Sequence, residues 1–118
     1  MTQENKDLLL RDLCARLPYG VKIQVPYEDG SGYFDETVWE VNNEGPFHVN
    51  GWGIEYEYVK PYLFPLSSIT KKTLEELSTY IDIKNVYVAV EFFNSHHIDY
   101  RGLIEKGLAV DATGLNIY

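Results

Sequence analysis

The hydrophobic residues of this chain change their spacing near residue 20, and this change most limits the fold. Before it, Leu9, Leu13 and Leu17 recur every four residues, which is the spacing of an amphipathic helix. After it, apolar and polar residues alternate from Val21 to Tyr27, which is typical of a half-buried strand. A helix followed by successive strands predicts a domain of the α+β class.

The N-terminal helix is predicted over residues 3–17. Thr2 is a suitable N-cap, and Pro18 and Gly20 form the stop signal that ends the helix. Cys14 lies beside the apolar stripe of this helix. Because free cysteine is among the most buried residue types, we expect Cys14 to be buried and chemically inert.

The strands are predicted to form a strongly bent antiparallel sheet of four or five strands over residues 20–64. Alternating patterns mark strands near residues 21–27, 33–42, 47–50 and 54–59, and glycine- and asparagine-rich turns separate them. A short, twisted sheet with one apolar face can close into a small barrel or lie under helices. Both arrangements fit the pattern.

The remaining part of the chain is predicted to add one or two helices. Residues 60–69 contain two prolines, which argues against a central strand, so this segment is expected to pack across the open end of the sheet. A helix is expected at 71–80. Residues 86–94 fit a strand by propensity and a helix by their apolar stripe, and the helix is preferred because no turn residues interrupt them. Residues 96–118 are expected to wrap the surface with at most one helical turn.

Length and composition predict one soluble domain over residues 1–118. The chain has 118 residues, which is a common size for one domain, and its single cysteine cannot form an internal disulfide. No apolar run reaches the length of a membrane span, and the N-terminus lacks the pattern of a signal peptide. A cytoplasmic location is therefore expected. The net charge of −8 disfavours binding to nucleic acid or to anionic membranes.

The negative charge is concentrated in the predicted sheet. Residues 20–69 have two basic and eight acidic side chains, so six of the eight net negative charges lie there, among many aromatic residues. Exposed tyrosine and tryptophan are enriched at protein interfaces, so this pattern predicts an acidic, aromatic protein-binding face. Mimicry of DNA is a weaker alternative, because the charge is modest. The candidate binding residues are Tyr27, Glu28, Asp29, Tyr33, Trp52, Glu55, Tyr56, Glu57 and Tyr58.

The densest group of reactive side chains is formed by His96, His97 and Asp99. Imidazole and carboxylate groups can bind a divalent metal or exchange protons, so a small metal-dependent hydrolase is an alternative function. Adjacent histidines point apart on a helix or strand, which weakens this hypothesis. In a structural alternative, the histidines satisfy carbonyl groups at a helix end, while Asp99 pairs with Arg101 or caps the next turn.

No other motif for catalysis or for a cofactor is present. Ser67 and Ser68 are not in the turn that activates a nucleophilic serine. The glycine-rich segments 30–32 and 51–53 resemble hairpin turns, because no helix follows a strand there as it does in phosphate-binding loops. We therefore predict no cofactor and no metal.

Three strings carry a resemblance to known proteins: residues 17–22 (LPYGVK), residues 59–68 (VKPYLFPLSS) and residues 96–109 (HHIDYRGLIEKGLA). They resemble a group of short proteins without assigned activity that recur in gut Bacteroides genomes and in their phages and mobile elements. The resemblance implies a bacterial or phage setting and an intracellular product. It supplies no catalytic residue, cofactor or partner.

These observations favour a non-enzymatic protein-interaction module of a phage or mobile element. Its partner is an unidentified protein that binds the acidic, aromatic face. A second copy of the chain is another candidate partner.

Overall fold

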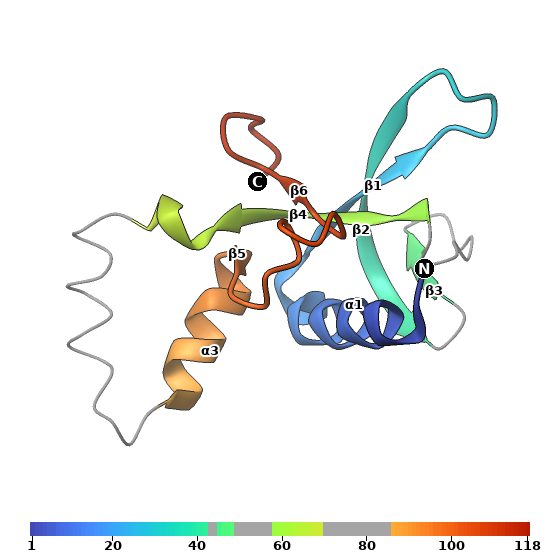
Figure 1. The fold of residues 1–118 in the computed structure, drawn as a ribbon. Coiled ribbons are helices and arrows are strands. Elements are labelled where there is room, and N and C mark those ends of the chain that lie inside the picture. The colour runs from blue at the N-terminus through green and yellow to red at the C-terminus, as the bar shows by residue number, and fades with distance from the viewer. Residues whose placement is uncertain (43–44, 49–57, 70–85) are drawn as a thin grey trace.

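The structure is a computed structural model, and it describes residues 1–42, 45–48, 58–69 and 86–118. It confirms the α+β class, with an N-terminal helix, a mixed sheet and a later helix (Figure 1). The expected strand at 54–59 and the expected helix at 71–80 lie largely or wholly outside the described residues. The helices are α1 (Gln3–Arg16), η1 (Leu17–Tyr19), η3 (Leu66–Ser68) and α3 (Val86–Ser95), and the strands are β1 (Lys22–Pro26), β2 (Tyr33–Asn42), β3 (Gly45–His48), β4 (Lys60–Pro65), β5 (Ile98–Asp99) and β6 (Val110–Asp111).

Helix α1 begins and ends as the sequence predicts. The Thr2 hydroxyl accepts a hydrogen bond from the Asn5 backbone N–H at 3.1 Å, which satisfies one of the free donors at the helix start. After η1, Gly20 has φ +68° and turns the chain toward β1. Glycine is favoured at this position because it has no Cβ to clash in the left-handed region.

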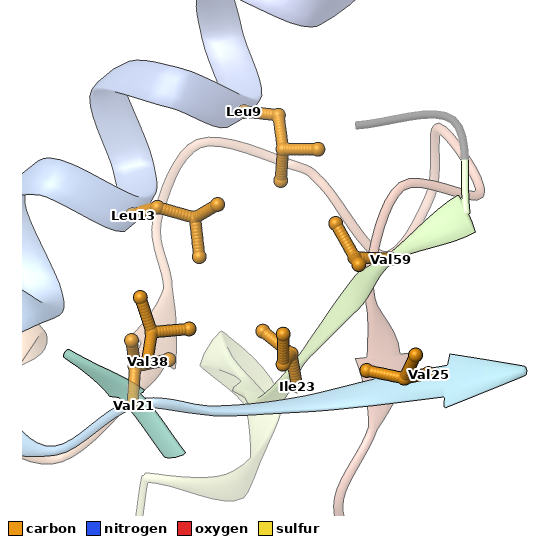
Figure 2. Close-up of a cluster of buried hydrophobic side chains, with 7 residues drawn as sticks. All are labelled: Leu9, Leu13, Val21, Ile23, Val25, Val38 and Val59. Atoms are coloured by element: carbon orange, nitrogen blue, oxygen red, sulfur yellow. The ribbon is translucent and has the colours of Figure 1, made fainter. Parts of the chain in front are cut away.

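The main core lies between α1 and one face of the sheet. Alternate residues of β1 point toward α1, and Figure 2 shows Ile23 and Val25 lying opposite Leu9 and Leu13 of the helix. A second buried cluster joins Leu63 of β4 to the segment that follows β5. The first cluster consists of Leu9, Leu13, Val21, Ile23, Val25, Val38 and Val59, and the second of Leu63, Leu103, Leu108 and Ala109.

The described strands form an open sheet in the order β3-β2-β1-β4-β5, with β6 also paired to β4. Strands β3, β2 and β1 pair in antiparallel fashion, as predicted, and β4 is also antiparallel to β1. The two short strands β5 and β6 pair with β4 in parallel, and no sequence pattern indicated them. Each is only two residues long, which is too short for an alternating pattern to be recognised.

The prediction that residues 60–69 avoid the centre of the sheet was wrong. Strand β4 occupies a central position, paired with β1, β5 and β6. Its prolines, Pro61 and Pro65, stand at the second and last positions, so the three residues between them keep their N–H groups. Phe64 uses its N–H to bond the His97 carbonyl oxygen at 2.8 Å. Proline, which has no N–H group, is excluded only from strand positions whose N–H would bond a neighbouring strand.

The segment after residue 85 combines a confirmed element with a missed one. Residues 86–95 form helix α3, as preferred from the apolar stripe. One hydrogen-bonded turn follows at residues 102–107, in agreement with the expected single helical turn. The rest of the segment does more than wrap the surface, because β5 and β6 extend the sheet.

The prediction that Cys14 is buried was also wrong. Cys14 is an exposed free cysteine. The buried residues of α1 are Leu9, Asp12, Leu13 and Arg16. Two charged residues, Asp12 and Arg16, therefore belong to the buried face of the helix, and Cys14 does not.

Among the described residues, no helix is both long enough and apolar enough to cross a membrane.

Candidate functional site

Two exposed tyrosines lie at the base of the loop that joins β1 to β2. Tyr33 is 63% exposed and Tyr27 is 48% exposed, although large aromatic side chains are usually more buried than this. Glu28 and Asp29, between them in the loop, are exposed as well. Figure 1 shows this hairpin projecting away from α1 and beyond the neighbouring strands. Aromatic and acidic side chains of the predicted face are therefore exposed together at this loop.

The hairpin loop is fixed by its own hydrogen bonds. The Tyr27 N–H donates to the Gly32 carbonyl oxygen at 2.9 Å, and the Gly30 N–H donates to the Tyr27 carbonyl oxygen at 3.1 Å. The Asp29 carboxylate accepts from the Ser31 N–H at 2.9 Å, and bonding to Ser31 lowers the pKa of Asp29. The Tyr27 ring lies 5.2 Å from the Phe34 ring, centroid to centroid. The loop thus presents its side chains from an ordered backbone.

The other predicted binding residues divide into two groups. Tyr58, just before β4, is 56% exposed. Trp52, Glu55, Tyr56 and Glu57 lie outside the described residues. The exposed part of the predicted face that the structure describes is therefore the hairpin loop with Tyr58.

His96 and Asp99 take the structural roles considered in the sequence. His96 follows α3, where its Nδ1 lies 3.0 Å from the Phe92 carbonyl oxygen, and its ring stacks on the Phe92 ring at 4.1 Å. The buried Asp99 carboxylate accepts hydrogen bonds from the Leu103 and Ile104 N–H groups at 3.0 and 2.9 Å. Asp99 therefore caps the next turn. Within the described part of the chain, no group of three or more His, Cys, Asp or Glu side chains is arranged to hold a metal ion.

His97 differs from its neighbours because it is buried in a backbone conformation that favours glycine. Its φ is +56° and only 6% of its surface is exposed. Burial, with the positive charge of Arg16 as the next cause, lowers the pKa of His97 to about 4. Its Nδ1 has no hydrogen-bond partner among the described residues. The ring is instead stacked on Tyr118, with centroids 3.8 Å apart and planes 11° apart.

A buried ion network, which was not predicted from the sequence, holds α1 to the segment around β5. Arg16 and Asp12 form an ion pair at 2.9 Å with both side chains fully buried. Arg101 pairs with the other oxygen of Asp12 at 2.8 Å, so it does not need Asp99 as its partner. Arg16 also donates to the carbonyl oxygens of Phe93 and Ile98. One feature of the sequence could have indicated this network: Asp12 and Arg16 are oppositely charged, lie four residues apart and are next to the apolar stripe of Leu9 and Leu13.

The Tyr118 side chain fills a specific place between β1 and β4. In the register of these strands, Ile23 pairs with Pro61 and Gln24 with Lys60, so the next pair is Lys22 with Tyr62. There the Tyr118 hydroxyl accepts from the Lys22 N–H at 2.9 Å and donates to the Tyr62 carbonyl oxygen at 2.8 Å. The phenol is thus inserted into the ladder as a bridge between the two strands.

The groups around the Tyr118 ring come from three different elements. His97, after α3, covers one face, the Phe64 ring of β4 lies 6.0 Å away, and Lys22 Nζ lies 6.0 Å from the ring centroid. Tyr118 as a whole is 44% exposed, but its phenol is partly shielded from water, and this desolvation raises the pKa of Tyr118 to about 12. We call the set Lys22, Tyr62, Phe64 and His97 the phenol socket.

Tyr62 also connects β4 to β2 on the face of the sheet that carries the phenol socket. Its side chain is buried, and its hydroxyl donates a short hydrogen bond to the Asp35 carboxylate. Burial and this bond raise the pKa of Tyr62 to about 12. Tyr62 is therefore a structural aromatic residue, in contrast to Tyr27 and Tyr33.

Protein-family models, curated proteins and solved structures were compared with this chain, and none matches. Function is therefore inferred from the contacts of the chain itself.

Proposed function

We propose that this protein is a non-enzymatic interaction module that binds a partner protein through the loop of the β1–β2 hairpin. The observation that carries the proposal is the exposure of Tyr27 and Tyr33 on either side of the acidic residues Glu28 and Asp29. Tyrosine side chains are enriched at interfaces because they bury a large area with few rotatable bonds and keep a polar tip. The bacterial or phage setting implied by the resemblance stays a prediction.

The order of the hairpin loop supports this role. Hydrogen bonds from the N–H groups of Tyr27, Gly30 and Ser31 hold the loop in one shape before a partner arrives. Binding then costs less conformational entropy than it would for a flexible loop. An ordered, projecting loop with exposed aromatic residues is therefore suited to recognition.

The charge of the loop favours a partner with a basic surface. Glu28 and Asp29 are exposed and adjacent, and six of the eight net negative charges of the chain lie in residues 20–69. Carboxylates on an exposed loop steer a lysine- or arginine-rich surface toward it, and arginine also stacks on tyrosine rings. Association should therefore weaken as the salt concentration rises.

The test compares two kinds of substitution in the hairpin loop. Tyr27→Ser with Tyr33→Ser removes the aromatic surface, and Glu28→Lys with Asp29→Lys reverses the charge. Proteins captured by the wild-type chain are identified, and the purified partner is then titrated against each variant. A loss of affinity of roughly tenfold or more is expected for both pairs, which corresponds to the removal of central interface contacts.

A charge control separates the loop from a general charge effect. Asp7→Lys with Glu105→Lys makes the same change in net charge at exposed positions away from the hairpin. This variant should keep the wild-type affinity within about twofold. Equal affinity of the wild-type protein and both hairpin variants would refute the proposed binding face.

A further inference from the structure

The phenol socket is formed by groups that other contacts hold in place. Two backbone pairs join β1 to β4 beside it, and the Phe64 N–H bonds the His97 carbonyl oxygen at 2.8 Å. Arg16 fixes the chain at Ile98, directly after His97. The backbone that carries the four residues of the socket therefore keeps its position without help from the Tyr118 side chain.

The segment that carries Tyr118 is held much less firmly. Residues 113–116 are all exposed. Before them, the Ala112 N–H bonds the Leu63 carbonyl oxygen at 2.9 Å, and after them Lys22 Nζ bonds the Ile117 carbonyl oxygen at 2.8 Å. Among the described residues, the phenol hydroxyl makes two hydrogen bonds from this segment to the sheet, and Ile117 accepts one. Segments with few buried contacts open locally at low cost.

The socket selects a phenol over other aromatic groups. Its polar groups are a backbone N–H on Lys22 and a carbonyl oxygen on Tyr62, so the occupant must accept and donate at the same atom. A hydroxyl group does both, whereas a phenyl ring leaves both backbone groups unpaired. The stacked His97 ring and the nearby Lys22 ammonium supply contacts for the π-system.

We propose that the phenol socket is a ligand-binding site for phenols, which Tyr118 occupies from within the chain and which an external phenol takes when Tyr118 leaves. The site uses different residues from the hairpin loop, so it does not depend on the proposed function. Suitable ligands carry their substituent opposite the hydroxyl, as the tyrosine side chain does. The two sources of such a group are a tyrosine in a polypeptide and a small free phenol.

The test uses the full chain with Tyr118→Gly, which empties the socket. Titration with p-cresol, followed by calorimetry or amide chemical shifts, should show saturable binding of one equivalent. Toluene, which lacks the hydroxyl, should bind roughly tenfold to a hundredfold more weakly, because two backbone groups stay unpaired. N-acetyltyrosinamide distinguishes the sources: affinity at least equal to that of p-cresol indicates a polypeptide tyrosine, and weaker binding indicates a free phenol.

A second substitution tests the placement of the ligand. His97→Gly suits the φ of +56° and removes the stacked ring. Added to Tyr118→Gly, it should weaken p-cresol binding by about tenfold, in line with the loss of a stacked aromatic contact. Absence of saturable p-cresol binding to folded Tyr118→Gly, equal affinity for toluene, or no effect of His97→Gly would overturn the proposal.

The wild-type protein gives an independent measurement if Tyr118→Gly fails to fold. Excess p-cresol should displace Tyr118 and speed hydrogen exchange at the N–H groups of Ala112 and Leu115, which are hydrogen-bonded in the closed state. The same concentration of toluene should leave the exchange rates unchanged. Exchange that does not respond to p-cresol would contradict the displacement of Tyr118.

Discussion

Asp12 accepts a hydrogen bond from Arg16 on one carboxylate oxygen, and both side chains are fully buried between α1 and the segment around β5. The second oxygen of Asp12 pairs with Arg101. One carboxylate therefore balances two guanidinium groups that belong to distant parts of the chain. Arg16 also donates hydrogen bonds to the carbonyl oxygens of Phe93 and Ile98, which lie before and after His97 in the chain. The His97 ring stacks on the Tyr118 ring.

Replacing Asp12 by alanine should destabilise the protein strongly. The change leaves Arg16 buried without its ion partner, and breaking a buried pair from one side costs about 3–5 kcal/mol. The free energy of unfolding from urea titration measures this loss. Asp7→Ala on the exposed face of the same helix is the control, and it should cost less than about 1 kcal/mol. Similar losses for the two variants would show that the buried network does not stabilise the fold.

Cys14 should react rapidly with a thiol reagent in the folded protein. Its side chain is exposed on α1, so the native and the denatured chain are expected to give the same extent of labelling. Reaction with an aromatic disulfide reagent, followed by absorbance, measures both. Cys14→Ser should abolish the signal, because the chain has no other cysteine. Labelling that requires denaturant would contradict the exposed position.

Tyr118→Phe should lower stability while the aromatic ring remains in the socket. The substitution removes the hydroxyl that bridges the Lys22 N–H and the Tyr62 carbonyl oxygen, which corresponds to about 1–3 kcal/mol where water does not replace it. Thermal unfolding measures the change. Tyr33→Phe, at an exposed position, is the matched control and should have almost no effect. Equal unfolding temperatures for both variants would show that the bridge is energetically unimportant.

Local sequence signals predicted the elements that depend on local physics. Helix α1 has a cap, an apolar stripe and a stop within its own segment, and its observed bounds agree with the predicted 3–17 to within one residue. Strand β2 has clear alternation and was predicted with its observed ends. In these segments, the same residues determine both the local conformation and the buried face.

The missed features depend on contacts between distant residues. Pro61 is compatible with a central strand because of its position opposite Ile23 of β1. The residues next to Pro61 in the sequence do not predict this pairing. Arg16 is buried because Phe93, Ile98 and Asp12 receive its N–H groups, two of them about 80 residues away. The two candidate sites differ in the same way. The hairpin was predicted from turn residues that are adjacent in the sequence, whereas the phenol socket joins distant segments and was not predicted.

His97 should make the stability of the protein depend on pH between about 4 and 6.5. The folded state lowers the pKa of His97 from 6.5 to about 4, so in this interval the unfolded chain binds the proton more tightly. Stability is therefore complete above pH 6.5 and declines as the pH falls toward 4, by about 3 kcal/mol at most. His97→Asn lacks this proton site, so the difference in unfolding free energy between it and the wild-type protein should shift by that amount across the interval. The carboxylates titrate in both proteins and cancel in the difference. Parallel curves for His97→Asn and the wild type would show that His97 does not stay neutral in the folded protein.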